Sequence, residues 1–163
     1  GHTFLLYLFA AKLNAAEVTV VDGPGYGRAE REKSMISGWF SLMKKFMKYV
    51  VNRNGAVVMV VDCGRGIQPE DRVLVEAMAR AKKPILVCLT KADRVGAEQI
   101  EKTICEIAEI KGGILPFGAV TSAAKGEGIG ELLALMEFCG KLDRDVLIDM
   151  CKSDNYEKTP LTT

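Results

Sequence analysis

The sequence has little of several features that mark particular classes of protein. Its 163 residues carry 22 basic and 21 acidic side chains, so no overall charge of one sign points to a nucleic-acid or membrane-surface binder. A single histidine and five widely spaced cysteines without a CxxC pair argue against a zinc site and a disulfide framework. No apolar run approaches the roughly 20 residues of a membrane span. The expectation that remains is one globular domain with an ordinary core.

Short apolar runs rich in branched residues recur along the chain. They lie at 18–22, 56–63, 84–93 and, with a weaker pattern, 114–122. Apolar residues follow one another in these runs instead of alternating with polar ones, which is typical of strands covered on both faces in a parallel sheet. The runs therefore predict four strands of such a sheet.

Segments with helical spacing separate these runs. Apolar residues recur at intervals of three and four over 30–51, and helices are also predicted at 69–82, 97–111 and 128–139. The alternation of strand and helix predicts an α/β fold, a doubly wound, mostly parallel sheet with helices on both faces. Ligands of such sheets bind at the carboxyl ends of the strands, so the loops there are candidate sites.

The loop after the first of these strands reads DGPGYG. Asp22 ends the strand and has the chemistry to hold a hydrated Mg²⁺ ion, while Gly25 lets a backbone amide approach a phosphate oxygen. The same residues also suit a tight turn with a capping Asp. The loop by itself leaves both interpretations open.

The loop after the run at 84–89 reads LTKAD and contains Thr90, Lys91 and Asp93. A fixed carboxylate accepts two hydrogen bonds from the N1–H and the exocyclic amine of guanine, whereas adenine would leave it unpaired. Such charge-assisted bonds contribute about 1.5 to 3 kcal/mol each, enough for a strong preference for guanine. The stem of Lys91 would lie along the base plane. The motif is short, and its position at a strand end is what favours a guanine site.

The loop after the last predicted strand reads TSAAKGEGIGEL. Its small residues Ser122, Ala123 and Ala124 would let a backbone amide reach the O6 atom of guanine. A glycine-rich turn that leads into a helix is the alternative. The order of the three loops and their common position at strand ends favour one guanine-nucleotide site over three unrelated turns.

With these loops in place, the sequence resembles the EngB (YihA) family of ribosome-biogenesis GTP-binding proteins, in the TrmE-Era-EngA-EngB-Septin-like class of P-loop GTPases. The resemblance covers roughly residues 1–140. DGPGYG matches the DxPGYG of the family, Trp39 falls where its following helix carries a Trp, and LTKAD matches in full. VVDCGRGIQPEDR at 60–72 is also similar, with Gly64 and Arg65 in place of a usual Arg-His pair.

The first residues, GHTF, resemble a switch segment whose sequence in the family is usually GRTQ. His2 and Phe4 depart from this pattern. The resemblance implies that Thr3 binds Mg²⁺ directly in the GTP state and that Asp22 holds it through water. It also implies that Gly25 has the catalytic role of contacting the γ-phosphate with its amide. Tyr26 stands where many relatives have a water-orienting glutamine, so we expect slow intrinsic hydrolysis and activation by a partner.

The phosphate-binding motif GxxxxGK[ST] is absent from the 163 residues. The resemblance places it upstream of Gly1, with a first strand and a first helix. We therefore expect residues 1–140 to be an N-terminally incomplete GTPase domain and 141–163 to be a helix end and a polar tail. The alternative is that another element fills the place of the missing segment.

The resemblance implies a protein that binds GTP and GDP with Mg²⁺ and hydrolyses GTP to GDP, if an intact phosphate-binding loop lies upstream. Its expected role is assembly of the large ribosomal subunit. One alternative is a catalytically inert GTPase-like binding module that is a structural part of an assembly complex. Another is an unrelated flavodoxin-like binding domain, which explains the sheet but not the guanine-type loop.

The expected partner is the precursor of the large ribosomal subunit, with its rRNA, ribosomal proteins and other assembly factors. No membrane and no DNA are expected as partners, and the protein is expected to be monomeric outside the complex. Basic residues of the predicted helix at 30–51 and just beyond it form either a solvated face or a patch for rRNA phosphates: Lys33, Lys44, Lys45, Lys48 and Arg53. Departures from the bacterial pattern at His2, Phe4 and Gly64 favour a mitochondrial location over the bacterial cytoplasm.

Overall fold

The described part of the chain falls into two units. A computed structural model describes residues 6–13, 16–23, 42, 46 and 55–152. The units are Gly1–Arg53 and Asn54–Thr163, and each is described by itself. Apart from positions 42 and 46, the helix predicted at 30–51 lies outside the described residues, and so do its basic side chains and the end of the polar tail.

The described strands of the first unit form an antiparallel pair. β1 is Tyr7–Leu13 and β2 is Ala16–Asp22, and their register runs from Tyr7 opposite Asp22 to Leu13 opposite Ala16. The strand predicted at 18–22 is confirmed and begins two residues earlier. Its described pairing, with β1, is antiparallel and not the parallel pairing that its apolar run indicates, because only two residues separate the two strands and so short a connection joins antiparallel strands.

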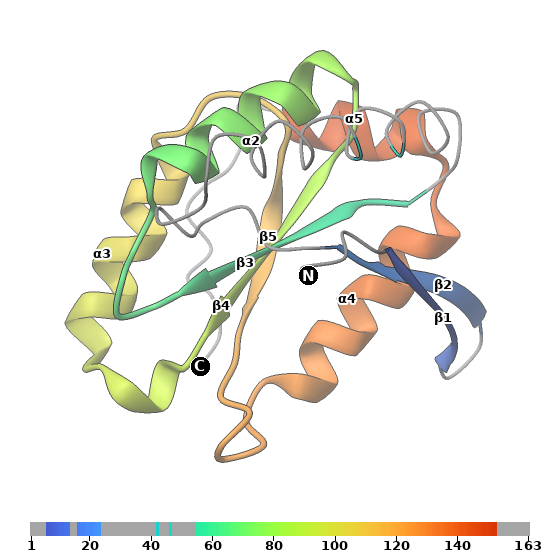
Figure 1. The fold of residues 1–163 in the computed structure, drawn as a ribbon. Helices are drawn as coiled ribbons and strands as arrows, with labels where there is room; N and C mark the ends of the chain where they lie inside the picture. The colour runs from blue at the N-terminus through green and yellow to red at the C-terminus, as the bar shows by residue number, and fades with distance from the viewer. Residues whose placement is uncertain (1–5, 14–15, 24–41, 43–45, 47–54, 153–163) are drawn as a thin grey trace. The chain divides into compact units, whose positions relative to one another are not determined.

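The second unit contains a parallel sheet of three strands in the order β3-β4-β5 (Figure 1). β3 is Val57–Asp62, β4 is Ile85–Thr90 and β5 is Ile114–Val120. These strands confirm the three predicted runs and their parallel direction. Thr90 is the last residue of β4, whereas the predicted site residues Lys91, Asp93 and Ser122 lie in the loops that follow β4 and β5.

Helices connect and cover the strands of this unit. The predicted helices at 69–82, 97–111 and 128–139 are confirmed as α2, Pro69–Arg80, α3, Ala97–Ala108, and α4, Ile129–Lys141. A 3-10 turn, η1, spans Ala92–Arg94, and a further helix, α5, spans Arg144–Lys152. The start of α2 is fixed as its acidic first turn predicts, since Asp71 Oδ2 accepts a 2.8 Å hydrogen bond from the Gln68 N–H.

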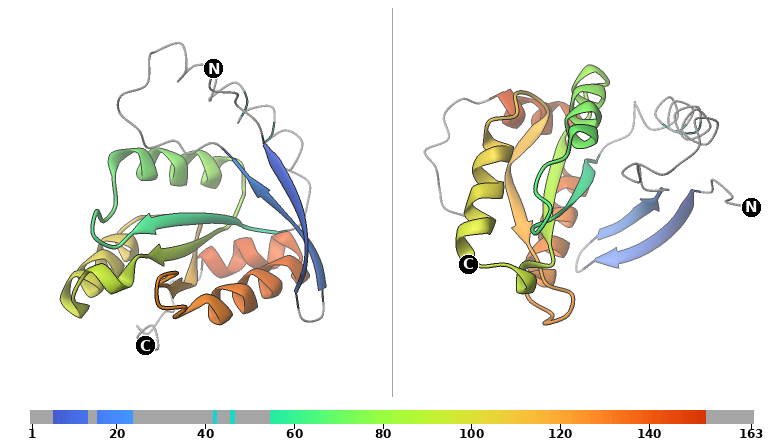
Figure 2. Two further views of the ribbon diagram at one scale, coloured as in Figure 1. Left: turned by 60° about the horizontal axis from the view of Figure 1, so that its bottom comes forward. Right: turned by 60° about the vertical axis from the view of Figure 1, so that its left-hand side comes forward.

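β4 is the centre of the core. Its residues from Ile85 to Leu89 are at most 5 % exposed, as expected for a parallel strand with neighbours on both sides and helices on both faces. Leu86 packs with Leu115 of β5, Cys139 of α4 and Leu147 of α5. The left view of Figure 2 shows α2 on one side of the strands and α4 and α5 on the other. The expected α/β architecture with helices on both faces is confirmed.

Candidate functional site

The carboxyl ends of β3, β4 and β5 lie at one edge of the parallel sheet, and the loops that follow them are held together by backbone hydrogen bonds. The Cys63 N–H donates to the Thr90 carbonyl at 3.0 Å, which joins the first loop to the second. The Ala92 N–H donates to the Thr121 carbonyl at 3.1 Å, which joins the second loop to the third. The three loops therefore form one continuous surface at the carboxyl edge.

Lys91 is held by an ion pair with the end of β3. Its Nζ lies 2.6 Å from Oδ2 of Asp62, the last residue of β3, and its own backbone is left-handed at φ 58° and ψ 35°. Oδ1 of Asp62 accepts a 2.9 Å hydrogen bond from the Gly64 N–H. The Lys91 ammonium holds the pKa of the Asp62 carboxyl below its ordinary value, and the Gly64 N–H adds to this shift against the effect of burial.

Asp93 is held by the third loop. The buried Ser122 hydroxyl donates a 2.6 Å hydrogen bond to Oδ1 of Asp93, and the Lys125 N–H donates to the same hydroxyl oxygen at 3.2 Å. The hydrogen bond from Ser122 is the main cause that lowers the pKa of the Asp93 carboxyl. Asp93 is otherwise exposed, so its carboxylate is an oriented anion that faces solvent.

Thr90 has a structural part in this arrangement. Its hydroxyl donates a 3.2 Å hydrogen bond to the Val61 carbonyl of the neighbouring strand. The hydroxyl therefore links β4 to β3 directly before Lys91. Of the predicted LTKAD residues, Lys91 and Asp93 present charged groups at the edge of the sheet.

The third loop is closed at its base. Ser122 and Glu127 exchange two backbone hydrogen bonds of 3.0 and 3.1 Å, so that Ala123 and Ala124 lie exposed in the turn between them. Gly128 follows with φ +70°, and a Cβ atom at this position would overlap the carbonyl oxygen of Val120. Glycine is required there because both the backbone angle and the close approach exclude a side chain.

The predicted site residues thus divide into three groups. Thr90, Lys91 and Asp93 lie at the end of β4 and in the loop after it, and Ser122 joins them through its hydrogen bond to Asp93. Ala123 and Ala124 lie in the same loop as Ser122. Asp22 ends β2 in the first unit, where it is exposed. Thr3 and Gly25 lie outside the described residues. The predicted roles of these last three residues at Mg²⁺ and the γ-phosphate therefore stay predictions.

Asp62 is a site residue that the sequence-based predictions did not include. The sequence contains a signal that could have identified Asp62. It is an acidic residue directly after an apolar run, at the end of β3, just as Asp22 is at the end of β2. Asp62 and Lys91 are 29 positions apart in the sequence. They come into contact because β3 pairs with β4, and this pairing cannot be read from the sequence.

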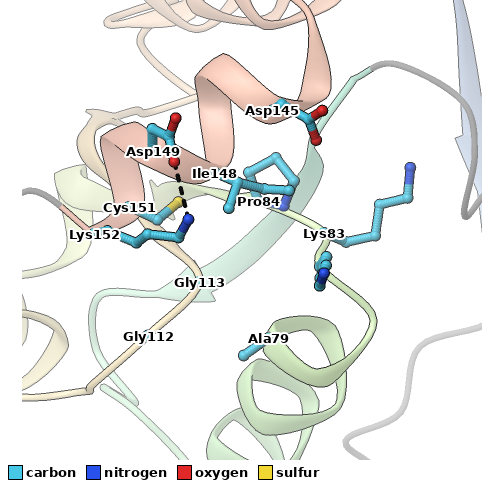
Figure 3. A pocket seen from close by; sticks show the side chains of 11 residues that line it. Ala79, Lys83, Pro84, Gly112, Gly113, Asp145, Ile148, Asp149, Cys151 and Lys152 are labelled. Atoms are coloured by element: carbon cyan, nitrogen blue, oxygen red, sulfur yellow. Dashed lines mark hydrogen bonds and ion pairs between the residues drawn. The ribbon is translucent and has the colours of Figure 1, made fainter.

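A cavity of about 490 Å³ lies at the other edge of the sheet, beside the starts of β4 and β5 (Figure 3). Its lining includes Pro84, Gly113 and the α5 ion pair between Lys152 and Asp149, whose Nζ and Oδ1 atoms are 2.9 Å apart. None of the predicted site residues lines it. Among the residues that the structure describes there is no group of three His, Cys, Asp or Glu side chains suited to a metal, and no helix with the length and apolarity of a membrane span.

Known proteins match both the sequence and the fold. The family described as the elongation factor Tu GTP binding domain matches residues 44–141. A protein of Nitrobacter winogradskyi named "Probable GTP-binding protein EngB" is 36 % identical in an alignment 142 residues long, which covers 83 % of this chain and 63 % of that protein. The chain therefore spans less than two thirds of this relative.

Two solved structures share the fold at lower identity. The apo form of translation elongation factor SelB from Methanococcus maripaludis has a TM-score of 0.65 at 22 % identity, covering 82 % of this chain and 27 % of SelB. A single-substitution variant of Era from Aquifex aeolicus, bound to GDP and AlF4-, has a TM-score of 0.64 at 22 % identity, covering 86 % of this chain and 46 % of Era. The family match spans more than half of the chain and agrees with the observed sheet and loops. The chain belongs to the P-loop GTPases, in the family of the elongation factor Tu GTP binding domain, and its resemblance to EngB proteins is confirmed.

Proposed function

We propose that the protein hydrolyses GTP to GDP and uses this cycle to time a step in assembly of the large ribosomal subunit. The observation that carries the nucleotide part is the oriented Asp93 carboxylate, fixed by Ser122 at 2.6 Å and exposed at the carboxyl edge of the sheet. Membership of a GTP-binding family supports the same assignment.

Guanine complements this arrangement. Its N1–H and exocyclic amine are two adjacent donors, and an ionised carboxylate accepts both. Adenine has no donor at N1, so its binding would desolvate Asp93 without replacing the lost hydrogen bonds. The backbone amides of Ala123 and Ala124 supply the donors for the guanine O6 atom in this proposal.

In this proposal, residues of the first unit contact Mg²⁺ and the γ-phosphate. Asp22 and Thr3 would hold the ion, and the Gly25 amide would contact the γ-phosphate. When bound, Mg²⁺ neutralises charge on the β- and γ-phosphates. The Tyr26 side chain is a phenol and lacks the amide group with which a glutamine orients water, which supports slow intrinsic hydrolysis and the need for an activating partner.

The ribosomal role rests on the resemblance to the EngB family and on the basic residues predicted along the helix at 30–51. The partner in this proposal is a large-subunit precursor with its rRNA, ribosomal proteins and other assembly factors. A mitochondrial location rests on the departures at His2, Phe4 and Gly64, whereas the matched EngB relatives are bacterial proteins, such as that of Nitrobacter winogradskyi. The bacterial cytoplasm is the alternative location.

A nucleotide-exchange experiment on the full-length protein tests the function. With Mg²⁺ present, fluorescent GDP should bind and be displaced by GDP but not by ADP or XDP. Asp93→Asn should reverse the preference toward XDP, because xanthine presents an acceptor where guanine presents its amine and the asparagine amide donates to it. Failure of the wild-type protein to bind GDP at millimolar concentration would refute the proposal. Binding without hydrolysis, even with large-subunit precursors added, would favour the inert binding module.

A further inference from the structure

Asp62 and Lys91 form a contact that the guanine motif does not include. Asp62 ends β3, whereas Thr90, Lys91 and Asp93 belong to the end of β4 and the loop after it. The Asp62 Oδ2 and Lys91 Nζ atoms are 2.6 Å apart, and Lys91 lies next to Thr90, which stands opposite Asp62 in the parallel register. The contact thus bridges two neighbouring loops at the carboxyl edge of the sheet.

Lys91 is a residue whose side chain needs to be held in place. A lysine side chain has four rotatable bonds, and fixing it against a base lowers its conformational entropy. The Lys91 side chain is 49 % exposed, so its stem is accessible to a base, and its ammonium is anchored by Asp62. An anchor that exists before the ligand arrives removes most of this ordering cost from the binding step.

Asp62 is itself a fixed anchor. Its Oδ1 atom accepts the Gly64 N–H at 2.9 Å, which leaves Oδ2 directed at Lys91. A Cβ atom at Gly64 would lie 3.3 Å from Oδ1, so a small residue at this position accommodates the carboxylate in its observed orientation. One oxygen is thus bound to the backbone of its own loop and the other to Lys91.

We propose that Asp62 is a positioning residue for guanine recognition, which holds the Lys91 stem beside the base position before the nucleotide binds. The proposal rests on the proposed function, since it assigns a role in the same site. Asp62 does not touch the base, and it acts through Lys91. Its loss should therefore weaken nucleotide binding chiefly by speeding dissociation, because a freed Lys91 no longer covers the base.

The experiment measures the affinity and dissociation rate of fluorescent GDP for the full-length protein by stopped flow. Asp62→Ala should weaken binding about tenfold, with most of the change in the dissociation rate. Asp62→Asn keeps an oxygen for the Gly64 N–H, so it should lose less affinity for GDP than Asp62→Ala. It can still be measured if the alanine variant does not fold. Glu76→Ala is the matched control, since it removes an exposed ion pair to Arg80 on α2, of 3.1 Å, without a contact to either loop.

A double-mutant cycle distinguishes positioning from a structural role. Lys91→Met keeps the stem and removes the charge, so Asp62→Asn should have no further effect on GDP dissociation in that background. The inference is overturned if Asp62→Ala leaves GDP dissociation unchanged, or if the effect of Asp62→Asn is as large in the Lys91→Met background as in the wild type. If the wild-type protein does not bind GDP, the proposed function itself is overturned. If the wild type binds GDP but the Asp62 variants behave as just described, only the role of Asp62 is overturned.

Discussion

The Ser122 hydroxyl donates a 2.6 Å hydrogen bond to Oδ1 of Asp93, although the two residues follow different strands and are 29 positions apart in the sequence. Ser122 is fully buried and Asp93 is exposed. The contact therefore connects the interior of the fold to the carboxylate that faces solvent. It both orients Asp93 and favours its ionised form.

Ser122→Ala should weaken GDP binding about fivefold to tenfold, because one charge-assisted hydrogen bond to the recognising carboxylate is lost. The preference for guanine over adenine should also fall. Thr103→Ala is a matched control, since Thr103 is another fully buried hydroxyl residue, whose Oγ1 donates to the Gln99 carbonyl at 2.9 Å in α3. An equal loss of GDP affinity in both variants would show that the effect comes from general destabilisation.

Gly128→Ala should lower the free energy of unfolding by about 2 kcal/mol or more, because the position combines a left-handed backbone with contact to the Val120 carbonyl. Gly130→Ala, two residues along in α4, meets no atom within 4 Å and should stabilise the protein by about 0.5 kcal/mol through helix propensity. Urea denaturation measures both values. Similar effects of the two substitutions would contradict the geometry assigned to Gly128.

Acidification should destabilise the second unit through Asp62 and Asp93. The pKa of each carboxyl is lowered from its ordinary value of 3.8 in the folded state, by Lys91 and by Ser122 respectively. Between the lowered and the ordinary pKa values, the unfolded chain therefore binds more protons than the folded protein. The stability that the two groups add is complete above the ordinary value and is lost as the pH falls through the lowered values.

Denaturation at several pH values between about 2 and 5 measures this dependence. Asp62→Asn removes one of the two groups, so its unfolding free energy should fall less steeply with decreasing pH. Equal slopes for the wild type and the variant would show that the Asp62 contact with Lys91 adds no stability.

Cys139 should resist alkylation. Burial raises the pKa of its thiol to about 11, so that only about one thiol in a thousand is ionised at pH 8. Cys105 is exposed on α3 and should react with iodoacetamide at least about tenfold faster. Mass spectrometry of timed samples gives both rates. Comparable rates in the native protein, rather than only in urea, would contradict the burial of Cys139.

The sheet of the second unit could be predicted from the sequence because its strands are short apolar runs, rich in branched residues in β3 and β4 and less so in β5. β4 and α2 are clear cases, since a fully buried strand and a Pro69 helix start leave strong local signals. α5 is not among the predicted helices. It has only nine residues, and Leu147 is its one fully buried side chain, so packing on β5 and α4 rather than local pattern stabilises it.

The candidate site was predictable only in part. LTKAD is a contiguous motif, and its position after a strand is visible in the sequence. The partners of its charged residues are not visible in the sequence. Asp62 approaches Lys91, and Ser122 approaches Asp93, only when the three strands are aligned in register. The antiparallel pairing of β2 likewise depends on a short connection that its apolar composition does not reveal.

Ser122 and Glu127, which exchange two backbone hydrogen bonds, make the four residues between them a loop whose ends are fixed side by side. An insertion in such a loop adds little closure entropy and leaves its base in place. Gly126 has a left-handed backbone at φ +72° that disfavours a side chain, so its exposed neighbour Lys125 is the more suitable point for an engineered optical reporter. If guanine nucleotide binds as proposed, a fluorophore there would report its binding and release in single molecules without a change to the buried Ser122.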